Sequence, residues 1–250
     1  AGVQPAEHGG HALAVLGEAS PRSQDAIAAV GEVVSSRIVA AALEDAGVAS
    51  AWVDARRVVV TSAEYTAAVP LMEDTAGRLT ETVAPALAAG RVPVMAGFIG
   101  ATREGVTTTL GRGGSDYSAS IVGACLGADE IQIWTDVDGM MTADPRLVPE
   151  ARLVPELSAD EASELAYFGA KVLHPSTILP AVQRGIPVRI LNSLRPGGGG
   201  TRITASSHAR GGELAAIASK RGVIKIDIIS TRMLMAWGFL SRVFAVFEKH

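Results

Sequence analysis

A glycine-rich segment from Thr107 to Tyr117 carries the strongest chemical signal in the sequence. It reads Thr-Thr-Thr-Leu-Gly-Arg-Gly-Gly-Ser-Asp-Tyr, and its pattern predicts that it follows a strand and opens a helix. Glycines let backbone N–H groups converge on an anion, and a helix N-terminus adds partial positive charge. Arg112 can grip a carboxylate with two parallel hydrogen bonds, beside the fixed negative charge of Asp116. An anion site and a plain glycine turn with a helix cap both fit the pattern, but a Walker A loop does not, because the chain has no Gly-Lys pair.

A second segment runs from Trp134 to Arg146 and holds three aspartates, at positions 136, 138 and 144. It follows a predicted strand, and open α/β sheets bind ligands at the carboxyl ends of their strands. An EF-hand loop does not fit, since Met141 and Leu147 stand where Gly and Glu are required. An Asp-Gly turn followed by an Asp-Pro turn remains the structural alternative to a ligand site.

A third segment, Phe168 to Pro175, contains one of only four lysines in the chain. Lys171 lies at the end of a predicted helix between apolar residues. A lysine there commonly interacts with the helix C-terminus while its stem covers apolar surface, so this position alone does not indicate catalysis. His174, directly before Pro175, is expected to be structural.

Composition narrows the class of protein. Of 250 residues, 48% are apolar and 19% are charged, as in globular enzymes. A net charge of −4 and a pI near 5.8 give no reason to expect nucleic acid or an anionic membrane as partner. No uninterrupted apolar run reaches the ~18 residues of a membrane span. The single cysteine, Cys125, excludes an internal disulfide and fits a cytoplasmic location.

Helical and strand patterns alternate along the chain, which predicts an α/β fold with a mainly parallel sheet. A domain boundary is expected near residues 210–220, after a glycine-rich loop. The expected helices are 20–46 in two pieces around Gly31, 69–89, 116–126 capped by Ser115 or Asp116, 159–171, 175–184 and 238–249. The expected strands are 51–53, 58–60, 92–99, 131–134, 187–191 and 223–229.

Taken together and in this order, the three segments resemble the aspartate kinase family. Gly-Phe-Ile-Gly at 97–100 and Gly-Glu at 31–32 add to the resemblance, which covers about residues 30–250. The tail 230–244 resembles the opening strand and helix of that family's first ACT domain. The resemblance implies a three-layer αβα amino-acid-kinase fold over 1–212, lacking its N-terminal part, and the beginning of an α+β ACT domain over 213–250.

The family resemblance also implies an activity, transfer of the ATP γ-phosphoryl group to the side-chain carboxylate of L-aspartate, giving 4-phospho-L-aspartate. Mg²⁺ is expected as the counter-ion of ATP, with no separate metal site in the protein. Catalytic roles fall to Asp116, which would orient cations, and Lys171, which would contact ATP phosphate. The implied substrate-binding residues are Glu32, for the ammonium group, Arg112, for a carboxylate, and Phe98, Gly113, Gly114 and Ser115. The nucleotide would contact Thr135, Asp136, Met141, Arg146 and Lys171.

The resemblance further implies an allosteric amino acid, with lysine as the first expectation, and a homo-oligomer formed through ACT domains. The implied effector-binding residues are Met233, Ala236, Phe239 and Leu240. The family's opening Lys-Phe-Gly-Gly loop is absent, so the chain is expected to be a fragment that is inactive alone. Two alternatives remain: another family member acting on acetylglutamate, glutamate or UMP, and a non-catalytic effector-binding polypeptide.

Overall fold

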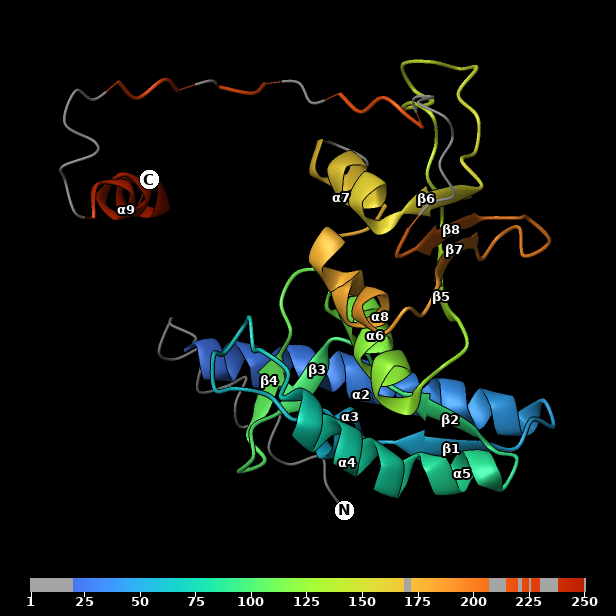
Figure 1. Cartoon of the computed structure of the whole chain (residues 1–250). Helices are drawn as coiled ribbons and strands as arrows, with labels where there is room; N and C mark the ends of the chain where they lie inside the picture. The colour runs from blue at the N-terminus through green and yellow to red at the C-terminus, as the bar shows by residue number, and fades with distance from the viewer. Residues whose placement is uncertain are drawn as a thin grey trace. The chain divides into compact units, whose positions relative to one another are not determined.

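The computed structural model describes residues 20–168, 172–206, 215–219, 222–224, 226–229 and 238–249 (Figure 1). The chain divides into two compact units, Ala1–Ser219 and Lys220–His250. The sequence-based boundary between residues 212 and 213 stays a prediction.

The first unit opens with one long helix, α2 (Pro21–Asp45). Ser20 caps it by accepting the Ser23 N–H, and Pro21 occupies the first turn, where no N–H is needed. The prediction of two helical pieces is wrong: a Cβ at Gly31 would meet no atom within 4 Å, and the helix passes through it unbroken. Its buried face repeats at helical spacing through Asp25, Ala29, Ser36 and Ala40.

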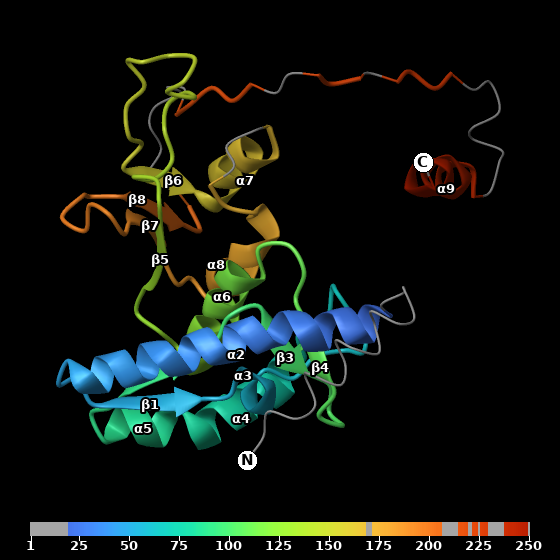
Figure 2. The ribbon, with the colours of Figure 1, turned by 180° about the vertical axis from the view of Figure 1, so that it is seen from behind.

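That face of α2 covers a small parallel sheet of β1 (Ser50–Val53) and β2 (Val92–Met95). Figure 2 shows α2 on one side of these strands, with α4 (Met72–Thr82) and α5 (Ala84–Ala88) on the other. A buried cluster of Val53, Val58, Val59, Leu79 and Val83 joins the sheet to α4. The result is a helix–sheet–helix sandwich, as expected when both faces of a parallel sheet are covered.

Two predicted strands differ from the structure. Residues 58–60 are not a strand: Ala55–Val58 form the short helix α3, capped by Asp54, and Val60 makes a single bridge to Ala101. The run 92–99 is interrupted over residues 96–98, where Phe98 has a φ of 68°, outside the extended region. A separate strand then follows, β3 (Ile99–Ala101), which pairs antiparallel with β4 (Thr107–Thr109).

Helix α6 (Gly114–Leu126) follows β4 and contacts α4, α8 and β5. Its N-cap is Gly113, with φ 70°, and not Ser115 or Asp116 as the sequence suggested. Gly127, with φ 65°, ends the helix in the left-handed conformation that favours glycine.

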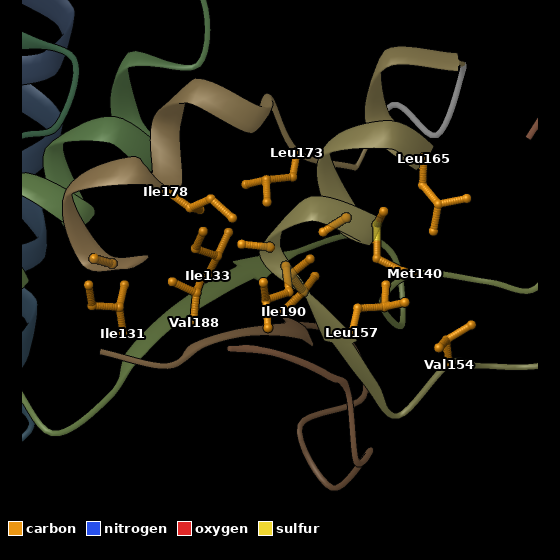
Figure 3. Close-up of a cluster of buried hydrophobic side chains, with 14 of the residues drawn as sticks. Ile131, Ile133, Met140, Val154, Leu157, Leu165, Leu173, Ile178, Val188 and Ile190 are labelled. Carbon is orange, nitrogen blue, oxygen red and sulfur yellow. The ribbon is translucent and has the colours of Figure 1, made fainter. Parts of the chain in front are cut away.

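A second sheet has the strand order β5-β7-β8-β6. The strands β5 (Ile131–Thr135) and β7 (Val188–Asn192) pair in parallel, while β8 (Thr201–Thr204) is antiparallel to β7 and parallel to β6 (Glu156–Ser158). The short strands β6 and β8 were not predicted. Apolar side chains of this sheet pack against α7 (Ala159–Phe168), η1 (Pro175–Ile178) and α8 (Leu179–Gln183) (Figure 3). Three of the five strand pairings are parallel, so the predicted α/β class is confirmed.

In the second unit, α9 (Phe239–Lys249) agrees with the predicted helix. The predicted strand at 223–229 is wrong for the residues of that range that the structure describes, none of which is in a strand. By length and composition alone, α2 could cross a membrane, which is weak evidence for a helix near the start of a chain. The helix contacts β1 and β2 and buries small residues such as Ala29 and Ala40, whereas its larger apolar residues, among them Ile27, Val34 and Ile38, are exposed.

Candidate functional site

The glycine loop, residues 111–115, joins β4 to α6. Gly111 and Gly113 have φ values of 74° and 70°, a region where a side chain is strained. Arg112 and Ser115 are exposed, and within the described part of the chain no hydrogen bond or ion pair involves the Arg112 side chain. The loop therefore presents a free guanidinium beside the N-terminus of a 13-residue helix, an arrangement that suits a carboxylate or phosphate ligand.

Phe98 is packed directly against this loop. Its N–H donates to Ser118 Oγ over 2.9 Å, and its carbonyl accepts the Leu110 N–H over 2.9 Å. A Cβ at Gly114 would lie 2.6 Å from the Phe98 ring, so only glycine fits there. The strained φ of Phe98 is thus held by hydrogen bonds from both sides, and Phe98 lies against the loop that contains Gly113, Gly114 and Ser115.

Asp116 lies in the first turn of α6 and is half-buried. Burial raises the pKa of its carboxyl above the usual value for aspartate. No cation among the described residues pairs with it. A carboxylate in this position is available to bind a cation carried by a ligand.

Glu32 comes from a different element, α2, and is half-buried. The residues around it, Ala29 and Val33, belong to the same apolar cluster as Phe98 and Ile99. This packing places α2 beside the turn that precedes β3. No hydrogen bond or ion pair joins Glu32 to Arg112, so both charges stay available to a ligand.

A second group of polar residues follows β5; we call residues 136–146 the β5 loop. Thr135 ends the strand, and its hydroxyl donates to Asp136 Oδ1 over 3.2 Å. The Thr135 carbonyl accepts both the N–H and the hydroxyl of Ser193, over 2.8 and 2.9 Å. The end of β5 is thereby tied to the end of its parallel neighbour β7.

The start of the β5 loop is fixed by three residues that the sequence analysis did not single out, namely Asn192, Arg195 and Thr201. Asp138 accepts a hydrogen bond from Asn192 Nδ2 over 2.8 Å and pairs with Arg195 over 2.7 Å. Thr201 Oγ1 accepts the Met140 N–H over 2.8 Å. Asn192 ends a strand parallel to β5, and that adjacency is the signal that could have identified it.

The remaining predicted nucleotide residues lie further along the β5 loop. Met141 makes one bridge to Leu153. Arg146 forms a two-pronged ion pair with Asp144, at 2.7 and 3.0 Å, and lowers the pKa of that carboxyl mainly through its hydrogen bonds. The Arg146 side chain is 86% exposed. To contact a nucleotide it has to exchange or share its bond to Asp144.

Some predicted residues lie outside the described part of the chain, namely Lys171, Met233 and Ala236. The segment that follows Lys171 does reach the glycine loop, because a Cβ at Gly113 would lie 2.8 Å from Thr177 Cγ2 and 3.4 Å from His174 Cβ. On α9, Phe239 is half-buried and Leu240 is 59% exposed. Among the described residues no cluster of three or more His, Cys, Asp or Glu side chains could hold a metal ion.

Comparison with known proteins identifies this architecture. The model of the amino acid kinase family matches residues 2–192. The chain belongs to the amino acid kinase family. The match begins well before residue 30, where the recognised motifs begin, so the family likeness extends further toward the start than those motifs indicated.

Within this family the chain is similar to aspartokinases, which confirms the resemblance seen in its motifs. It is 42% identical to aspartokinase 1, chloroplastic, of Arabidopsis thaliana, over 95% of this chain and 42% of that protein. Escherichia coli aspartokinase III in complex with aspartate and ADP superposes with a TM-score of 0.72 at 38% identity, over 81% of this chain and 46% of the other. The same enzyme in complex with lysine and aspartate gives a TM-score of 0.74 at 35% identity, over 92% and 52%.

The chain therefore spans about half the length of these relatives. The amino-acid-kinase fold predicted from the sequence is confirmed by these solved structures.

Proposed function

We propose that this chain provides the site of an aspartate kinase, which transfers the γ-phosphoryl group of ATP to the side-chain carboxylate of L-aspartate. The observation that carries the proposal is the glycine loop, where Arg112 is exposed beside the start of α6 and has no partner among the described residues. The likeness to an aspartokinase covers 95% of this chain at 42% identity. An E. coli relative has been solved with aspartate and ADP, the two ligands such a site has to hold.

The amino acid is proposed to lie between the glycine loop and α2. Arg112 would bind one carboxylate with two parallel hydrogen bonds, and Glu32 would receive the ammonium group. Phe98, Gly113, Gly114 and Ser115 would shape the pocket at the helix start. The opposite charges of Arg112 and Glu32, which come from different elements, would select a zwitterionic substrate and fix its orientation in the site.

The nucleotide is proposed to lie at the end of β5. Thr135, Asp136, Met141 and Arg146 would line its site, and Lys171 would contact phosphate. We further propose Mg²⁺ as the counter-ion of ATP, with Asp116 as a carboxylate that holds cationic groups near the transferring phosphoryl. Phosphoryl transfer depends on positioning and on charge neutralisation, which are the roles that these residues can fill.

We propose that the segment that contains α9 has two regulatory roles. It would bind an amino-acid effector, and it would join copies of the protein into a homo-oligomer. Lysine is the first choice, because an E. coli relative has been solved with lysine and aspartate. The effector-binding residues would be Met233, Ala236, Phe239 and Leu240. Calorimetric titration with lysine, threonine and methionine separately tests this choice, and binding of threonine alone would overturn it.

A substrate panel tests the proposed activity. The longest natural protein that contains this chain is assayed for ADP release with Mg-ATP and, in turn, aspartate, acetylglutamate, glutamate and UMP. We expect turnover with aspartate and at least tenfold lower kcat/KM with the others. Preference for acetylglutamate, glutamate or UMP would assign the chain to another branch of the family. No turnover with any substrate, from protein that binds ATP, would favour a non-catalytic role.

A further inference from the structure

Asp25 is a buried carboxylate for which the proposed reaction has no direct use. It is 1% exposed and lies near the start of α2. The Thr66 N–H donates to both of its oxygens, at 2.9 and 3.1 Å. Thr109 donates twice, from its N–H over 3.1 Å and from its hydroxyl over 2.7 Å. No ion pair of the described residues includes Asp25, so these donors satisfy its two buried oxygens.

Both partners of Asp25 lead to the glycine loop. Thr109 ends β4, two residues before Gly111. Thr66 has a φ of 71°, which is strained for threonine, and a Cβ at Gly111 would lie 3.1 Å from its carbonyl oxygen. The Ala68 N–H also donates to the Thr109 carbonyl over 2.9 Å. A single carboxylate therefore holds the loop before α4 and the strand before the glycine loop against one helix.

The same helix carries Glu32, seven residues further on. Seven residues are close to two helical turns, so both side chains lie on one side of α2, about 10 Å apart along its axis. Figures 1 and 2 both show α2 running alongside β4, and the two elements are in contact. The distance from Glu32 to the glycine loop is thus set by what fixes α2 on β4.

We propose that Asp25 is a positioning residue for the amino-acid substrate, which sets the spacing between Glu32 on α2 and Arg112 in the glycine loop. This inference rests on the proposed function. Glu32 and Arg112 would grip opposite ends of one small molecule, and a displacement of about 1 Å in such a site can cost about 100-fold in rate. The β5 loop is held by other bonds, to Asn192, Arg195 and Thr201, so nucleotide binding does not depend on Asp25.

Asp25→Asn is the sharpest variant, because it keeps the size of the side chain but places an NH₂ donor against N–H and O–H donors. Thr109→Val removes one hydroxyl donor and keeps the N–H, and Thr109→Ser restores the hydroxyl. Asp54→Asn is the matched control, since among the described residues the hydrogen bonds of Asp54 go only to its neighbour Arg56. All four are measured in the longest natural protein that contains this chain.

We expect Asp25→Asn to raise the KM for aspartate about tenfold and to leave the KM for ATP within twofold of wild type. Thr109→Val should give a smaller rise in the same direction, and Thr109→Ser and Asp54→Asn should stay near wild type. An equal rise in both KM values, or an unchanged KM for aspartate in a folded Asp25→Asn protein, overturns the inference. If Asp25→Asn does not fold, the KM values of Thr109→Val and Thr109→Ser are compared with each other, and only Thr109→Val should show the raised KM for aspartate.

Hydrogen exchange provides a readout that does not require activity. Asp25→Asn or Thr109→Val should speed amide exchange in residues 107–115 while leaving α7 unchanged. Unchanged exchange in 107–115 would show that Asp25 does not fix the loop and would overturn the inference. A wild-type protein that does not phosphorylate aspartate would instead refute the proposed function, and exchange would still decide whether Asp25 fixes the glycine loop.

Discussion

The glycine loop and the β5 loop differ in how the rest of the fold holds them. The glycine loop is enclosed by segments far away in sequence, with Thr66 on one side, Phe98 on another and Thr177 on a third. The β5 loop is fixed by such contacts only in its first half, through Asp138 and Met140 and through the Thr142 carbonyl, which accepts the Ile217 N–H over 2.8 Å. Its later part relies on short-range bonds such as Asp144 to Arg146. A loop held on several sides is the one proposed to bind the small amino acid, and a loop held mainly in its first half is the one proposed to bind the larger nucleotide.

The largest expected effect is on catalysis at the glycine loop. Asp116→Asn should lower kcat by about 100-fold or more, because a neutral amide cannot hold cations at the transferring phosphoryl. Asp160→Asn, a carboxylate in the first turn of α7, is the matched control and should retain wild-type kcat. Steady-state kinetics checks both, and an Asp116→Asn protein within a few-fold of wild type would remove Asp116 from the mechanism.

The pH dependence of the same residue gives a second test. Burial raises the pKa of Asp116, and only its ionised form holds cations, so kcat/KM should fall as pH drops through a value above that of an ordinary aspartate. The raised pKa also means that the ionised carboxyl opposes folding at neutral pH. Asp116→Asn should therefore keep or slightly raise the free energy of unfolding. A large loss of stability in this variant would show that Asp116 is structural.

Substrate binding at the glycine loop gives the next largest effect. Arg112→Lys keeps the charge but loses the planar two-pronged geometry, so the KM for aspartate should rise about tenfold while the KM for ATP stays unchanged. Arg103→Lys is the matched control, because Arg103 makes a surface ion pair with Asp74. If Arg112→Lys changed the KM for ATP and not that for aspartate, the two ligand sites would be reversed.

The glycine loop itself can be compared with another glycine of the same helix. Gly113→Ala adds strain at φ 70° and a Cβ 2.8 Å from Thr177, whereas Gly127→Ala adds strain alone, because the space around Gly127 is open. We expect Gly127→Ala to cost about 1 kcal/mol in the free energy of unfolding and Gly113→Ala about 2–4 kcal/mol. Denaturant unfolding measures both, and equal costs would mean that Thr177 does not confine the loop.

The position of the glycine loop could be predicted from the sequence, but the contacts that hold it could not. The glycine loop and its position at a helix start follow from local residue types, which is why Arg112 and Asp116 could be named in advance. Asp25 could not, because an aspartate within a helix has the same local pattern whether it faces solvent or three distant donors. The capping of α6 by Gly113 and the break at Phe98 depend on tertiary packing against Thr177 and Gly114, which local patterns do not contain.

The smallest expected effect lies at the β5 loop. Asn192→Ala removes the bonds to Asp138 and to the Leu194 N–H, which should lower the free energy of unfolding by about 1–2 kcal/mol. The KM for ATP should rise a few-fold with no change in that for aspartate. Arg195→Ala is the control, because its side chain is 70% exposed and such ion pairs contribute about 0–1 kcal/mol. A change confined to the KM for aspartate would contradict the assignment of aspartate to the glycine loop and of ATP to the β5 loop.

Identification of the product tests the central claim most directly. Transfer to the side-chain carboxylate of aspartate creates an acyl phosphate, which hydroxylamine converts to a hydroxamate. The longest natural protein that contains this chain, supplied with Mg-ATP and aspartate, should form one aspartyl hydroxamate per ADP released, and its Asp116→Asn variant should form almost none. ADP release without hydroxamate, or equal yields from both proteins, would contradict the assignment of this chain as an aspartate kinase with its reaction centre at the glycine loop.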